Sequence, residues 1–266
     1  MSKPIRSWST DDLTYLVKAL IPESSDIEHL VGLLRDDEQL TEAMLHDDRL
    51  FEQLTAAGEL LVSVSPTLFF RVLLLRARRD LEGASYTVER RQQQKIILFD
   101  VPQVVELLGE PGVVDHLARM LASFTHINSV TIPIRAGPGL WRRLRVNDLD
   151  VESLIRWAEL LHEEQRFAAY QRVADACLFM TGLFPEHVTG SRRRVRLQGS
   201  TLAGLEEYET YGRRYYALAA AHETARFQGL DTVLALLSER FILAEKPLAF
   251  LAEHYLFLKK HRLFDA

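Results

Sequence analysis

Apolar side chains recur every three or four residues over most of the chain, which is the spacing of helices with one buried face. Four short helices of this kind are expected near residues 13–20, 27–34, 40–45 and 50–54. Ser65 followed by Pro66 predicts the start of a longer helix, and Gly83 predicts its end. The pattern therefore predicts a mainly α, multi-helix protein.

The stretch 94–149 interrupts this pattern with β-rich segments. Residues 86–88 and 96–99 predict two short strands, followed by a helix over 102–108. The residues from Gly109 to Gly112 are typical of a turn, and a second helix is expected over 113–124. Residues 130–135 and 140–146 then predict a small central β-hairpin.

Helix, turn, helix and hairpin is the order of elements in a winged helix-turn-helix unit, which this stretch resembles. The resemblance implies that the helix 113–124 faces a DNA major groove through His116, Arg119 and Ser123. It also implies phosphate contacts from the basic side chains of the hairpin: Arg135, Arg142, Arg143 and Arg145. Winged units also dock proteins, so the resemblance does not choose between these partners.

Residues 150–266 show helical spacing again, with a predicted loop over 189–200. That loop holds a second basic cluster, which includes Arg192, Arg193 and Arg194. We therefore expect three regions: an acidic helical bundle over 1–83, a winged-helix-like unit over 84–149 and a helical region over 150–266. The sequence also allows all three to pack as one domain.

Charge is unevenly distributed along the chain. Residues 1–69 hold 5 Lys and Arg against 13 Asp and Glu, a net of −8, whereas residues 70–146 hold 12 against 7, a net of +5. The remainder holds 15 against 17, which gives the total of −5. A basic middle is compatible with an anionic partner, although arginine is also an ordinary residue of helix surfaces.

Cysteine content and hydropathy indicate the compartment. The single cysteine, Cys177, excludes an internal disulfide framework and a cysteine-rich zinc site. No apolar run reaches the roughly 18 residues that a membrane span needs, and the first residues lack a signal-peptide core. We expect a cytoplasmic protein that does not contact a membrane.

Evidence for enzyme chemistry is sparse. Phosphate-binding glycine loops and zinc-protease motifs are absent. Glu159 and His162 have the spacing of a di-iron helix, but a second copy of that motif is missing. A tyrosine-rich segment with Tyr208 and Tyr216 is more typical of helix packing than of a ligand groove. The string H-E-x-x-R-F occurs at 162–167 and again at 222–227, as a duplication or by coincidence.

These observations favour a non-enzymatic binding or regulatory protein, associated with nucleic acid through the winged-helix-like unit. The first alternative is a helical protein–protein interaction scaffold, and a metal-dependent enzyme comes last. A protein partner and a homo-oligomer stay open, and no cofactor or metal is expected. The residues expected to contact nucleic acid are His116, Arg119, Arg135, Arg142, Arg143, Arg145, Arg192, Arg193 and Arg194.

Overall fold

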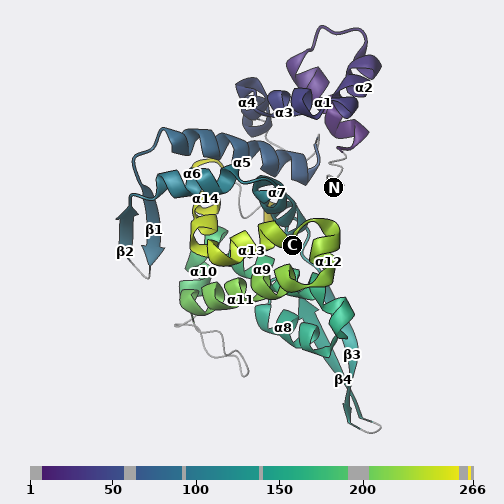
Figure 1. Cartoon of the computed structure of the whole chain (residues 1–266), viewed down its shortest axis with the longest axis vertical. Coiled ribbons are helices and arrows are strands. Elements are labelled where there is room, and N and C mark those ends of the chain that lie inside the picture. The colour runs from purple at the N-terminus through teal and green to yellow at the C-terminus, as the bar shows by residue number, and fades with distance from the viewer. Residues whose placement is uncertain are drawn as a thin grey trace.

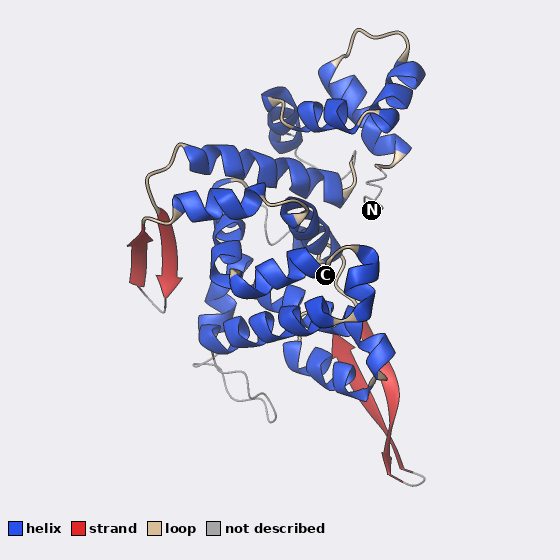
Figure 2. Ribbon diagram, viewed as in Figure 1, coloured by secondary structure: helices blue, strands red, loops and turns tan. Residues whose placement is uncertain are grey.

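The computed structural model describes residues 8–56, 64–91, 94–137, 140–190, 204–257 and 263–264. Within these ranges the chain forms 14 α-helices, a single turn of 3-10 helix (Glu163–Gln165) and two antiparallel β-hairpins (Figures 1 and 2). The prediction of a mainly helical protein with a small central hairpin is confirmed. None of the helices in these ranges is both long and apolar enough to cross a membrane.

The N-terminal bundle consists of four short helices and lies at the top of Figure 1. The helices are α1 (Thr10–Leu20), α2 (Ile27–Asp36), α3 (Glu38–Leu45) and α4 (Asp48–Ala56). The first three begin where a side chain accepts a hydrogen bond from a backbone N–H of the first turn, as N-caps do; these side chains are Ser9, Asp26 and Asp37.

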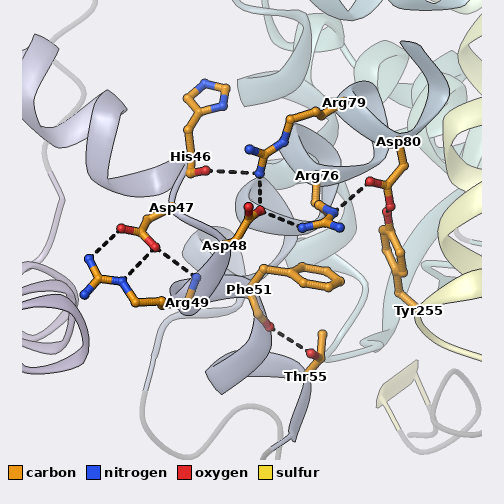
Figure 3. Close-up of polar contacts among 10 residues, drawn as sticks. All are labelled: His46, Asp47, Asp48, Arg49, Phe51, Thr55, Arg76, Arg79, Asp80 and Tyr255. Atoms are coloured by element: carbon orange, nitrogen blue, oxygen red, sulfur yellow. Dashed lines mark hydrogen bonds and ion pairs between the residues drawn. The ribbon is translucent and has the colours of Figure 1, made fainter. Parts of the chain in front are cut away.

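A polar cluster joins this bundle to helix α5 (Pro66–Glu82) and to the C-terminal end of the fold (Figure 3). The Asp48 carboxylate, at the start of α4, pairs with Arg76 at 2.6 Å and with Arg79, both on α5. Arg76 also pairs with Asp80, whose other oxygen accepts a hydrogen bond of 2.6 Å from the Tyr255 hydroxyl. These contacts fix α5 between segments that are far apart in the sequence.

The middle of the chain contains both hairpins and the helix pair between them. Strands β1 (Thr87–Arg91) and β2 (Gln94–Leu98) form the first hairpin, and helices α6 (Val101–Gly109) and α7 (Val113–Ser123) follow. Strands β3 (Ser129–Gly137) and β4 (Leu140–Asn147) form the second hairpin, which projects from the helical body at the lower right of Figure 1.

The C-terminal half packs around α9 (Arg166–Leu183), which is largely buried. Helices α8 (Val151–Leu160), α11 (Leu205–Ala221) and α14 (Phe241–His254) all pack against it. Three short helices complete this half: α10 (Pro185–Gly190), α12 (Glu223–Gln228) and α13 (Asp231–Glu239). The division into three regions at residues 83 and 149 stays a prediction.

Helix α7 lies inside this packing and not on its surface. It packs against α5, α9 and α13, and most of its side chains are buried. Arg119 and Ser123, one helical turn apart, are its exposed side chains. The surface that α7 presents to solvent is therefore narrow.

Candidate nucleic-acid interface

The hairpin β3–β4 is held at its base by α8 and exposes one face to solvent. Val146 is buried where β4 packs on α8. The Asn147 side chain donates a hydrogen bond of 2.7 Å to Ser129, and the Asn147 backbone N–H donates one of 3.1 Å to Ser153 on α8. Beyond this base, the strands extend away from the helices (Figure 2). The hairpin therefore projects from the helical body while its base is fixed to α8.

The strand register gives the hairpin two chemically different faces. Val130 pairs with Val146 and Ile132 with Leu144, so one face is apolar, and Ile132 and Leu144 pack against the core. Because side chains alternate along a strand, Trp141, Arg143 and Arg145 lie on the opposite side of β4. We call these three residues the basic face; all three are exposed, Trp141 by 65%.

Arg142 differs from the other hairpin arginines. It is exposed, but the alternation of β4 places it on the side of Leu144, opposite to Arg143 and Arg145. The expected row of hairpin phosphate contacts is therefore divided between two faces. Within the described residues, none of Arg142, Arg143 and Arg145 forms an ion pair, so their charges are open to an external anion.

Four of the expected basic residues cannot be placed on this surface. Arg135 lies in β3, where its backbone pairs with Trp141, and that pairing is all that is described of it. The cluster of Arg192, Arg193 and Arg194 lies outside the described residues.

His116 does not point outward, which corrects the prediction for α7. Its side chain is buried, with the whole residue 2% exposed. Its Nε2 atom lies 3.0 Å from Asp175 Oδ1 on α9 and 3.4 Å from the Tyr216 hydroxyl on α11. The Tyr216 hydroxyl donates a hydrogen bond of 2.7 Å to the same Asp175 oxygen. We call His116, Asp175 and Tyr216 the polar triad.

The polar triad has a defined pattern of donors and acceptors. Because a carboxylate only accepts hydrogen bonds, His116 Nε2 must donate to Asp175, which leaves Nδ1 as an acceptor in the neutral ring. His116 Nδ1 makes no hydrogen bond to any residue of the described chain. Burial raises the pKa of Tyr216 well above its usual value, and the charge of Asp175 raises it further, so this hydroxyl stays protonated.

A cleft of about 380 Å³ opens beside the polar triad. His116, Met120 and Asp175 are buried residues that line it, whereas Arg119 and Ala168 line it and are exposed. It therefore has a buried floor and an open rim. Arg119 and Ser123, the other two predicted residues of α7, line this cleft and do not belong to the basic face.

Arg172 connects the cleft to the base of the hairpin. Its Nε and Nη2 atoms each lie 3.1 Å from Asp148, just after β4, and its Nη1 atom donates a hydrogen bond of 2.7 Å to Ser123. The guanidinium lies 3.8 Å from the centre of the Phe124 ring, a cation–π distance. The guanidinium is therefore held in one orientation at the edge of the cleft.

The two H-E-x-x-R-F strings lie side by side in the fold. His162 and His222 have nearly the same extended backbone conformation, and each begins a short helical segment. Both following arginines donate to the carbonyl oxygen five residues earlier, Arg166 to Leu161 and Arg226 to Ala221. The strings also contact each other, since His222 Nε2 lies 2.9 Å from the Glu163 carbonyl oxygen.

The residues considered for enzyme chemistry are separated. Helix α8 ends at Leu160, so Glu159 and His162 do not share a helical turn. In the part of the chain that the structure describes, no three His, Cys, Asp or Glu residues are grouped as metal ligands would be. Cys177 is fully buried, and burial raises the pKa of its thiol, which disfavours the nucleophilic thiolate.

No protein-family model, curated protein or solved structure matches this chain. The site therefore rests on its own geometry. Sequence reasoning missed Asp175 and Arg172, and it interpreted Tyr216 as a helix-packing residue. These side chains lie up to 100 residues from their partners. The only early signal was that Asp175 interrupts an otherwise apolar helical segment.

Proposed function

We propose that this protein is a non-enzymatic binding protein that contacts the sugar–phosphate backbone of nucleic acid through the hairpin β3–β4. The observation that carries the proposal is the basic face. Arg143 and Arg145 lie on one exposed face of a projecting hairpin, beside the exposed Trp141, and neither forms an ion pair within the described chain. Guanidinium groups bind phosphate oxygens well, and an indole can stack on a base or a sugar.

In this proposal the hairpin acts as the wing of a winged-helix-like unit. The order of α6, α7, β3 and β4 supports that comparison. The burial of His116 does not support base reading by α7, because a groove-reading helix needs several exposed side chains. We therefore propose backbone contact with little dependence on base sequence.

A protein partner is the second candidate, and one observation favours it. Trp141 and Val130 are both largely exposed on the hairpin, and aromatic and arginine side chains are enriched in protein–protein interfaces. Salt dependence separates the two candidates, because contact with phosphates releases bound counterions.

The test is a titration of a labelled short DNA duplex, followed by fluorescence anisotropy at about 50 and about 200 mM salt. If two or three arginines contact phosphates, the affinity should fall by roughly 10- to 40-fold between these conditions, from a slope of about −0.9 per contact. Two duplexes of unrelated sequence should bind with similar affinity. Absence of binding at the lower salt concentration would refute the proposal.

A further inference from the structure

The cleft beside the polar triad has the size and composition of a small-molecule site. Its volume of about 380 Å³ falls within the usual range of ligand pockets, roughly 300–1,000 Å³. It combines buried polar groups at its floor with an open rim, as described above. The hairpin is not among its lining residues, so the cleft is a separate site from the basic face.

The cationic groups at the cleft favour an anionic group on the ligand. Arg119 and Arg172 both line it. Arg172 uses three of its five N–H groups on Asp148 and Ser123, which leaves two for a ligand. The oxygens of the cleft carboxylate, Asp175, already accept hydrogen bonds from Tyr216, His116 and, at 3.5 Å, Gln171.

The floor of the cleft offers a hydrogen-bond acceptor of fixed orientation. Asp175 holds the His116 ring through Nε2, and Nδ1 is left without a partner in the described chain. Asp175 is therefore a positioning residue, and His116 is the group that would contact a ligand N–H or O–H. A ligand N–H or O–H placed here would give Nδ1 the hydrogen bond that no residue of the described chain supplies.

The remaining side chains fit a flat heterocycle. Gln171 and Gln228 line the cleft, and each amide presents a donor and an acceptor, the pattern displayed by the edge of a nucleobase. Met120 and Leu230 supply apolar surface for the faces of a ring, and a thioether makes favourable contacts with aromatic systems.

We infer that the cleft binds a nucleotide, with its phosphate toward Arg119 and Arg172 and its base among Gln171, Gln228 and Met120. The same chemistry can come from a free mononucleotide or from the phosphorylated end of a strand. This inference does not rest on the function proposed for the hairpin.

The test is isothermal titration of the full chain with AMP, UMP and inorganic phosphate. We expect AMP or UMP to bind at least about tenfold more tightly than inorganic phosphate, because the base adds contacts that phosphate lacks. Ala168→Trp, which fills the cleft from an exposed helical position, should weaken nucleotide binding by at least about tenfold. Ala217→Trp, an exposed position on α11 that does not line the cleft, is the matched control and should bind as the wild type does.

Two further variants keep the result interpretable. Arg119→Ala should weaken AMP binding without filling the cleft, which covers the case in which Ala168→Trp fails to fold. Arg143→Ala/Arg145→Ala should leave AMP binding unchanged, so this inference and the hairpin proposal can fail separately. A further probe shows whether the natural ligand is a free mononucleotide or the phosphorylated end of a strand. The probe is an oligonucleotide with a 5′-phosphate, compared with its 5′-hydroxyl form and with AMP. A strand-end site binds the phosphorylated oligonucleotide more tightly than AMP, and a mononucleotide site binds AMP more tightly.

The inference is overturned if none of these probes binds, or if inorganic phosphate binds as tightly as AMP. It is also overturned if a folded Ala168→Trp protein binds AMP with wild-type affinity.

Discussion

At the scale of single residues, the polar triad places three hydrogen-bonding side chains in the buried core. Buried polar groups destabilise a fold unless they are hydrogen-bonded, and here one carboxylate serves two buried donors from two other helices. The triad therefore connects α7, α9 and α11, and two of its members, His116 and Asp175, also line the cleft.

Tyr216→Phe removes one donor to Asp175 while keeping the ring. We expect the free energy of unfolding to fall by about 1.5–3 kcal/mol, the range for a hydrogen bond to a charged group. The matched control is Tyr211→Phe on the same helix, where the side chain is only half-buried and a change within about 0.5 kcal/mol is expected. Urea unfolding of both variants measures the difference, and equal effects would contradict a stabilising role for the triad.

Alkaline pH provides a second test at this scale. Burial raises the pKa of Tyr216 well above its usual value and that of Tyr208 to about 12. Because tyrosines of the unfolded chain ionise near pH 10, the stabilisation from these neutral hydroxyls is complete below that pH and decreases above it.

The measurement is the free energy of unfolding at about pH 8 and about pH 11 for the wild type and Tyr216→Phe. Stability should fall with rising pH in both proteins, and it should fall less in the variant, which lacks one such hydroxyl. A decrease of the same size in the two proteins would exclude the contribution of Tyr216.

At the scale of elements, local sequence signals were sufficient for much of the fold. Ser65 and Pro66 begin α5 as predicted, with the Ser65 side chain accepting from the Leu68 N–H. The β-rich segments 130–135 and 140–146 correctly predicted a hairpin, because β3 and β4 pair antiparallel. These signals succeed because caps and turns depend on residues close together in the sequence.

Which side chains of a helix or strand face solvent was harder to predict than whether the helix or strand exists. Helix α7 packs against α5, α6, α9 and α13 and is therefore buried on more than one side. The assumption that it has a single buried face placed His116 outward, although His116 is buried. The separation of Arg142 from Arg143, in contrast, follows from strand alternation and could have been predicted once the hairpin was recognised.

Close packing between helices gives a prediction at this scale. A Cβ atom added to Gly212 on α11 would lie 2.3 Å from the Phe241 ring on α14, whereas one added to Gly32 on α2 would contact nothing within 4 Å. Gly212→Ala should therefore destabilise the protein by about 1–3 kcal/mol through overpacking. Gly32→Ala should stabilise it by about 0.5–1 kcal/mol, because alanine favours the helix. Thermal unfolding checks the sign of each change, and a neutral or stabilising Gly212→Ala would show that the two helices can separate freely.

At the scale of the whole molecule, the arrangement of parts depends on pairs that the sequence does not reveal. Arg71 on α5 is buried and pairs with Glu42 of the N-terminal bundle at 2.5 Å and with Asp115 on α7. The triad and the Asp48 cluster likewise join residues that are distant in the chain. Composition and periodicity cannot assign such partners, which is why the cleft was not predicted while the hairpin was.

The resulting molecule carries three exposed arginines, Arg142, Arg143 and Arg145, on a projecting hairpin that lies away from the acidic N-terminal bundle (Figure 1). Backbone contact by that hairpin is the central claim, and paired variants test it most directly. Arg143→Ala/Arg145→Ala removes two charges from the basic face. Arg213→Ala/Arg214→Ala removes the same number from exposed positions on α11.

The deciding measurement is the salt dependence of DNA binding by the wild type and these two double variants. We predict that the slope of log affinity against log salt decreases in magnitude by about 2 for Arg143→Ala/Arg145→Ala and changes little for Arg213→Ala/Arg214→Ala. Equal slopes for the two double variants would contradict the claim that the hairpin contacts the phosphate backbone.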